Sequence, residues 1–204
     1  MPTDRISELK NLHLHGMASA LQALLAEASR RPARPELWLD RLIQAAHADR
    51  QVRRLSYQLK AARFPIHRDL GGFDWQETPL IRESIEQLAE GTFMDGAHNL
   101  ILVGGTGTGK THLATALGVG AIHQGKRVRF YNAVDLVNHL EREKQQGKAG
   151  NLAKQLQHID AVILDELGYL PFPDSGGALL FHLISQLYEK TSLIVTTNLS
   201  FGEW

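Results

Sequence analysis

The sequence predicts an α/β protein in which helices cover a parallel sheet, preceded by a small all-helical domain. From about residue 71 onward, short apolar runs alternate with amphipathic helical segments, which is typical of parallel sheets. Residues 5–63 instead space their apolar side chains at helical intervals. We therefore expect a helical domain over 1–70 and an α/β domain over 71–204.

The N-terminal part is predicted to form helices on both sides of a proline-rich break. The stretch ISELKNLHLHGMASALQALLAEA precedes the break RRPARPE, and ELWLDRLIQAAHADRQVRRLSYQLKAARF follows it. Pro35 suits the first turn of the second helix, and Pro65 ends it. Gly71 and Gly72 then indicate a linker.

The C-terminal part contains four strand-like runs with helical segments between them. The runs are NLILVG (99–104), RVRFYN (127–132), AVILDE (161–166) and SLIVTTN (192–198). The helical segments run from Lys110 to about His123, Val134 to Gln146, Leu152 to Gln157 and Ala178 to Glu189.

Composition favours a soluble cytoplasmic protein with an anionic partner. The chain has no cysteine, which excludes disulfides and thiolate metal sites and suits a reducing cytosol. No run approaches the roughly 20 apolar residues of a membrane span. The net charge of zero conceals an asymmetry: residues 1–70 hold 12 Lys+Arg against 7 Asp+Glu, and residues 71–204 hold 10 against 15.

A phosphate-binding loop lies between the first strand and its helix. Gly104, four further residues and then Gly109-Lys110-Thr111 match GxxxxGK[ST] in the context that this motif requires. Backbone N–H groups and the helix N-terminus would bind phosphate oxygens. Lys110 would neutralise the β- and γ-phosphates, and the Thr111 hydroxyl would bind Mg²⁺. The expected ATP-binding residues are Gly104, Gly105, Thr106, Gly107, Thr108, Gly109, Lys110, Thr111 and His112.

Two adjacent acids end the strand-like run AVILDE. Ligands of open α/β sheets bind at the carboxyl ends of the strands, where Asp165 and Glu166 lie. We expect Asp165 to hold Mg²⁺ and Glu166 to polarise the water that attacks the γ-phosphate. Asn198 ends another buried run, so its amide could reach the same water; the alternative is an asparagine that simply terminates a strand.

Other users of a phosphate loop fit less well. A GTPase needs an NKxD segment after a strand, and NAVD at 132–135 has the wrong residue beside its asparagine. Small-molecule kinases seldom need the Asp-Glu pair, because the substrate hydroxyl replaces the attacking water. The pattern therefore favours nucleotide hydrolysis, with Lys110, Glu166 and Asn198 as the expected catalytic residues.

These residues make the chain resemble an AAA+ ATPase of the helicase-loader clade. More narrowly, it is similar to the IstB-type transposition helper ATPases of insertion sequences, which are related to DnaC helicase loaders. The similarity rests on GGTGTGKTHLA (104–114), GKRVRFYNAVDLV (125–137), ILDELGYLPF (163–172), TTNLSFGEW (196–204), LKNLHLHGMASAL (9–21) and RQVRRLSYQLKAARFP (50–65).

The resemblance implies a P-loop AAA+ fold, ATP and Mg²⁺ as ligands, homo-oligomeric assembly on double-stranded DNA and presentation of that DNA to a transposase. Family members continue past the FGEW segment with a last strand and with an arginine that reaches the neighbouring subunit's γ-phosphate. This sequence ends at Trp204 and supplies four strand-like runs. We therefore expect an open edge beside the phosphate-loop strand and impaired self-sufficient hydrolysis.

A basic stretch of the second N-terminal helix is the candidate DNA-binding surface. Its positive side chains are Arg50, Arg53, Arg54, Lys60 and Arg63. Val52, Leu55, Leu59 and Ala62 are expected to form an apolar face of the same helix. Such a surface could neutralise phosphates without reading bases; the alternative is a solvated helix face. Phe73 and Trp75 are expected to pack near the adenine or in the core.

The sequence thus predicts an ATP- and Mg²⁺-binding AAA+ protein that assists DNA transposition, with ATP hydrolysis controlling its disassembly. Two alternatives stay open: a DnaC-like loader that grips a replicative helicase, and a nucleotide-binding remnant without turnover.

Overall fold

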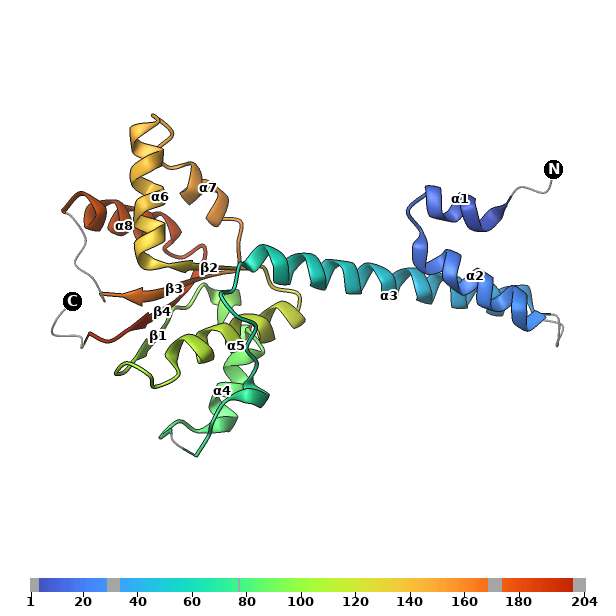
Figure 1. Ribbon diagram of the computed structural model, residues 1–204, viewed down its shortest axis with the longest axis horizontal. Helices are drawn as coiled ribbons and strands as arrows, with labels where there is room; N and C mark the ends of the chain where they lie inside the picture. Colours follow the sequence, from blue (N-terminus) through green and yellow to red (C-terminus); the bar gives the residue numbers. More distant parts are fainter. Residues whose placement is uncertain (1–3, 29–33, 77, 169–173, 200–204) are drawn as a thin grey trace. The chain divides into compact units, whose positions relative to one another are not determined.

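The computed structural model describes residues 4–28, 34–76, 78–168 and 174–199 (Figure 1). The chain divides into two compact units, residues 1–57 and residues 58–204, inside helix α3 (Pro35–Ala62). This division lies upstream of residue 70, because Ala62 and Phe64 belong with the α/β unit. Ala62 is fully buried, and the Phe64 ring lies edge-on to that of Phe130 at 6.3 Å between centroids.

The first unit contains α1 (Arg5–Asn11), α2 (His15–Ala28) and the first part of α3. The Asp4 side chain caps α1 by accepting a hydrogen bond from the Ile6 N–H. The sequence pattern was continuous through residues 6–28, but the helix breaks at His13, whose φ is 58°. The Leu14 N–H donates to the Leu9 carbonyl oxygen, and this bond closes the end of α1. The spacing of the leucines does not indicate that end.

Close backbone approach holds α2 against α3 in this unit. A Cβ atom on Gly16 would overlap the Ala45 carbonyl oxygen, so only glycine allows this approach. Ala18 and Leu24 are buried. Several side chains that the helical spacing selected are exposed instead, namely Leu12, Leu25, Leu39 and Val52. Their spacing predicted helix correctly, but a unit this small buries only part of its apolar surface.

The second unit is built on one parallel sheet with the strand order β1-β4-β3-β2. The strands are β1 (Leu100–Val103), β2 (Val128–Asn132), β3 (Ala161–Leu167) and β4 (Ser192–Thr197). All four predicted strands are present, and the parallel arrangement is confirmed. β1 lies at an edge, and no described strand pairs with its other side, as expected from the sequence.

Helices cover both faces of the sheet (Figure 1). On one face α5 (Lys110–His123) contacts all four strands, and α4 (Arg82–Ala89) packs on α5. On the other face lie α6 (Ala133–Gln145), α7 (Asn151–Leu156) and α8 (Asp174–Leu187). Their apolar side chains join those of β3 and β4 in one core, which includes Leu136, Leu156, Leu164 and Leu187.

Between α3 and β1 the chain forms elements that the sequence pattern did not predict. These are the 3₁₀ helices η1 (Leu70–Gly72) and η2 (Thr92–Gly96), and α4 between them. No helix in the described ranges is long and apolar enough to cross a membrane. Because the sheet is parallel, β1, β4 and β3 end side by side, which brings together the loop after Val103, Asn198 and the Asp165-Glu166 pair.

Candidate nucleotide-binding site

The loop between β1 and α5 has the backbone geometry of a phosphate-binding loop. Gly107 and Gly109 have φ values of 80° and 83°, in the left-handed region that glycine adopts without strain. Gly109 is also the N-cap of α5, so the helix begins at Lys110 with its free N–H groups facing the loop. The Thr108 hydroxyl donates to the Gly105 carbonyl at 2.9 Å and closes the loop on itself.

Lys110 folds back across this loop. Its Nζ donates to the Gly105 carbonyl oxygen at 2.6 Å. The ammonium group is therefore held at the mouth of the loop, where an anion would meet it together with the backbone N–H groups. A phosphate oxygen is a stronger acceptor for this charge than a neutral carbonyl.

Thr111 and Asp165 meet across the gap between α5 and β3. The Thr111 hydroxyl lies 2.9 Å from Asp165 Oδ1 and 3.0 Å from Oδ2. Asp165 is only 5% exposed, so its carboxylate is oriented by protein donors and not by bulk water. The two residues that the sequence assigned to Mg²⁺ are thus adjacent in space.

Glu166 is exposed at the same end of β3, in an unusual backbone conformation. Its φ is 64°, which costs an L-residue of this size about 1 kcal/mol or more. Asn132, at the end of β2, donates from Nδ2 to Glu166 Oε2 at 2.8 Å. Sequence reasoning did not select Asn132; the available signal was a polar residue at the carboxyl end of a neighbouring strand.

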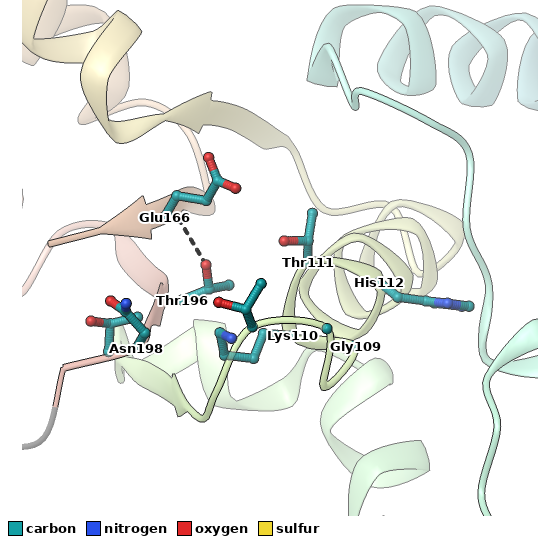
Figure 2. Close-up of a pocket in the computed structure, with 10 residues that line it drawn as sticks. Gly109, Lys110, Thr111, His112, Glu166, Thr196 and Asn198 are labelled. Carbon is teal, nitrogen blue, oxygen red and sulfur yellow. Dashed lines mark hydrogen bonds between the residues drawn. The ribbon is translucent and has the colours of Figure 1, made fainter. Parts of the chain in front are cut away.

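A cavity of about 290 Å³ lies among these groups (Figure 2). Lys110, Thr111, Glu166, Thr196 and Asn198 line it, together with residues of the loop. Asn198 is exposed and follows the last residue of β4, so it faces the same space as Glu166 (Figure 2). Thr196, which the sequence did not single out, lies between the acidic end of β3 and the loop.

His112 points away from Glu166, toward the segment that precedes α4 (Figure 2). Its Nε2 lies 2.9 Å from the Asp69 carbonyl oxygen, and its ring stands perpendicular to that of Phe73 at 5.3 Å. Phe73 in turn lies 4.9 Å from Trp75. The His112 ring is therefore engaged by the protein, which leaves its backbone N–H as the group to face a phosphate.

A second, mainly apolar cavity of about 510 Å³ lies on the β1 side of the loop. Phe73, Leu80, Ile101 and Val103 are among its lining residues. Ile101 and Val103 are 38% and 46% exposed at the free edge of the sheet. Phe73 is thus buried against the loop and also lines this cavity, while its packing near the adenine stays a prediction.

Comparison with known proteins agrees with this geometry. The family model described as IstB-like ATP binding protein matches residues 7–204, nearly the whole chain. The chain belongs to this IstB-like family. It is 34% identical over 203 residues to an insertion sequence IS5376 protein of Geobacillus stearothermophilus that is named as ATP-binding, with 98% of this chain and 81% of that protein covered. It is 35% identical over 197 residues to an IS21 protein of Pseudomonas aeruginosa with the same designation, covering 96% and 74%.

Solved structures place the IstB-like chain in the AAA+ fold. The crystal structure of the DnaC helicase loader matches with a TM-score of 0.53 and 29% identity, covering 59% of this chain and 69% of that one. The replication initiator DnaA bound to AMPPCP and single-stranded DNA matches with a TM-score of 0.57 over 67% of this chain and 43% of that one. At 22% identity, the DnaA match supports only a shared fold.

The residues of the IstB-like site fit a magnesium nucleotide. The loop supplies backbone donors and the Lys110 charge for phosphate oxygens, and Thr111 and Asp165 supply two oxygen ligands of the kind that Mg²⁺ prefers. No group of three or more His, Cys, Asp or Glu side chains in the described ranges could hold a metal ion by itself.

The candidate DNA-binding side chains, which lie on α3 and directly after it, are divided between the two units. Arg50, Arg53 and Arg54 belong to the first unit, whereas Lys60 and Arg63 belong to the second. All five are exposed. Arg53 forms an ion pair with Asp49 at 2.6 Å. The apolar face expected beside them is only partly realised, since Val52 is exposed and Ala62 is buried.

Proposed function

We propose that this IstB-like protein is a Mg²⁺-dependent ATPase that assembles on double-stranded DNA as a homo-oligomer and assists a transposase. The observation that carries the proposal is the convergence of the phosphate loop, the Thr111–Asp165 pair and Glu166 at one edge of the sheet. Membership of a family described as ATP-binding supports nucleotide binding. The experiments below test ATP hydrolysis, DNA binding and the transposase partner.

The geometry supports a division of labour among the site residues. The loop N–H groups and Lys110 bind the phosphates, while Thr111 and Asp165 hold the Mg²⁺ that would offset their charge. Glu166 lies at the cavity, and no hydrogen bond from a described residue reaches its Oε1, which can accept a proton from an attacking water. The Asn198 amide lies across from it and can orient the same water.

DNA binding is assigned to the exposed basic side chains of α3. Arg50, Arg53 and Arg54 are spaced i, i+3 and i+4 along the helix, so their charges gather on one of its faces. Such a distribution suits electrostatic contact with a phosphate backbone better than the reading of one base edge. We propose that the protein presents this DNA to a transposase, because its relatives are proteins of insertion sequences.

ATP turnover by the full chain, with and without duplex DNA, tests the proposal. We expect DNA-stimulated release of phosphate that a Glu166→Gln variant loses while it still binds nucleotide, since glutamine is nearly isosteric but cannot take the proton. Arg41→Ala is a matched control, because Arg41 is exposed and its partner Glu27 lies outside the site. Binding without turnover in the parent chain would contradict the ATPase assignment and favour a non-hydrolysing nucleotide-binding protein.

A helicase loader is the second candidate function. It is favoured by the DnaC structure, which at 29% identity is more than a likeness of fold. In that case the N-terminal helices would grip a hexameric helicase instead of a transposase. Pull-down of the full chain with a purified replicative helicase, and in parallel with the transposase of the same insertion sequence, distinguishes the two.

A further inference from the structure

The pairing of β3 with β4 is interrupted where the site begins. Leu164 pairs with Val195 and Leu167 pairs with Thr197, so two residues of β3, Asp165 and Glu166, face the single residue Thr196. Such a bulge re-aims side chains and leaves a backbone group without its ladder partner. Here the bulge places two consecutive acids at the same edge of the sheet, where Asp165 accepts from Thr111 and Glu166 accepts from Asn132.

The Thr196 hydroxyl occupies this interruption and bonds to both acidic residues. Its Oγ1 donates to Asp165 Oδ1 at 2.6 Å. It also accepts from the Glu166 N–H at 2.9 Å, the bond that is dashed in Figure 2. The side chain is 1% exposed, so water cannot replace either bond. The donor and the acceptor capacity of one hydroxyl are thus both used, each on a different residue of the site.

Each of these bonds has a consequence for the chemistry of the site. Asp165 Oδ1 accepts from both Thr111 and Thr196, and these two bonds fix the plane of the carboxylate. The direction in which its remaining lone pairs could bind a metal ion is therefore fixed as well. Glu166 has a φ of 64°, a conformation that persists in a non-glycine residue only when its surroundings hold it. The bond to Thr196 is one such restraint, because it satisfies the N–H that the bulge removes from the ladder.

We infer that Thr196 is a positioning residue. It orients the Asp165 carboxylate, which would bind Mg²⁺, and it holds the backbone of Glu166. The inference rests on the proposed function, since it concerns the same magnesium–nucleotide site. Thr196 itself contacts neither metal nor water in this role; it acts through its two neighbours on β3.

The test replaces the hydroxyl while keeping the side-chain volume. In Thr196→Val, the Mg²⁺ concentration that gives half-maximal binding of the fluorescent nucleotide mant-ATP should rise roughly 10- to 100-fold, the usual effect of removing a group that orients a metal ligand. Binding in EDTA should match that of the parent chain. The kcat for ATP should fall while KM stays nearly constant, because phosphate contacts remain. Thr196→Ser keeps the hydroxyl and should restore both properties.

Thr191→Val is the matched control. Thr191 is equally buried and donates to the Leu156 carbonyl at 2.9 Å, but it lies at the opposite end of β4 from the site. Loss of the Thr191 hydroxyl should lower the melting temperature without changing the Mg²⁺ requirement of nucleotide binding. Equal Mg²⁺ requirements in the two valine variants would overturn the inference, as would a serine variant as impaired as valine. If Thr196→Val does not fold, the serine variant and Thr196→Ala carry the same comparison.

The binding arm of this experiment does not depend on turnover. A parent chain that binds Mg²⁺–mant-ATP without hydrolysing ATP would count against the proposed function, yet the Mg²⁺ requirement of the variants would still decide the role of Thr196. The two failures are therefore distinguishable.

Discussion

Asn132 joins the start of helix α6 to the acidic end of β3, because its two amide atoms serve different elements. Nδ2 donates to Glu166 Oε2 at 2.8 Å, and Oδ1 accepts from the Val134 N–H at 3.0 Å as the cap of α6. The cap fixes the amide, and the amide then holds the Glu166 carboxylate toward β2. Asn132 therefore restrains the carboxylate that we assign to hydrolysis.

Replacing Asn132 by aspartate separates these two functions. Aspartate caps a helix as well as asparagine, so the melting temperature should change little. It cannot donate to Glu166 and repels its carboxylate, which releases Glu166 toward the cavity. We expect DNA-independent ATP turnover to rise about fivefold, the factor that corresponds to some 1 kcal/mol of released restraint. Steady-state phosphate release measures this; turnover that falls in Asn132→Asp would show that the contact aids hydrolysis.

The backbone of Glu166 offers a prediction about stability. Its φ of 64° is strained for any residue except glycine. Glu166→Gly and Glu166→Ala both delete the carboxylate and its bond to Asn132, but only glycine also removes the strain. The glycine variant should therefore be more stable than the alanine variant by about 1 kcal/mol, or roughly 2–4 °C in melting temperature. An alanine variant that melts at the same temperature as the glycine variant would contradict a strained conformation at this position.

The strands and the phosphate loop could be predicted because their signals are local. Apolar runs of strand length, the GxxxxGK[ST] spacing and the acids after AVILDE each depend on a few consecutive residues, and the parallel sheet then brings Thr111 and Asp165 together. The predicted ends of these elements differ from the observed ones by a few residues, as at α8, which begins at Asp174 and not at Ala178. The segments ILDELGYLPF (163–172) and TTNLSFGEW (196–204), which carry part of the resemblance, lie partly outside the described residues.

The remainder depends on contacts between distant residues or on single backbone angles. Asn132 and Thr196 acquire their partners only when β2 and β4 are placed beside β3, and neither carries a motif of its own. The break at His13 follows from one positive φ angle within an unbroken leucine pattern. Leu12 and Val52 fit the helical spacing yet are exposed, because periodicity shows which side chains share a face but not whether another element covers it.

The basic side chains of α3 make a prediction about salt dependence. Replacing Arg50, Arg53 and Arg54 together by alanine removes three exposed charges from the first unit. If each meets a DNA phosphate, the slope of log K against log salt concentration should become shallower by about 0.9 for each contact. Fluorescence anisotropy with a labelled duplex at several salt concentrations measures the slope. Arg41→Ala serves as the control, and an unchanged slope in the triple variant would exclude these arginines as phosphate contacts.

Tyr131 on β2 predicts a loss of stability at high pH. Burial raises the pKa of Tyr131, and the charges of Arg63 and Arg129 lower it to a smaller extent. The folded chain therefore holds the phenolic proton more tightly than the unfolded chain, whose pKa is about 10. The free energy of unfolding is unaffected by this group below that pH and decreases as the pH rises through the raised value. In denaturant unfolding, Tyr131→Phe should lose less stability than the parent chain when the pH is raised from 9 to 11. Tyr188→Phe, at an exposed position, should behave like the parent chain.

Gly107 and Gly109 form a matched pair for the packing beneath the phosphate loop. Both have φ near 80°, so alanine imposes about 1–2 kcal/mol of backbone strain at either position. A Cβ atom on Gly109 would also lie 3.0 Å from Phe73 Cε2, whereas no described atom lies within 4 Å of a Cβ on Gly107. Gly109→Ala should thus destabilise the nucleotide-free chain by about 1–3 kcal/mol more than Gly107→Ala. Thermal unfolding measures the difference, and adding Phe73→Leu should reduce the cost of Gly109→Ala but not that of Gly107→Ala. Equal costs in both backgrounds would mean that Phe73 does not support the loop.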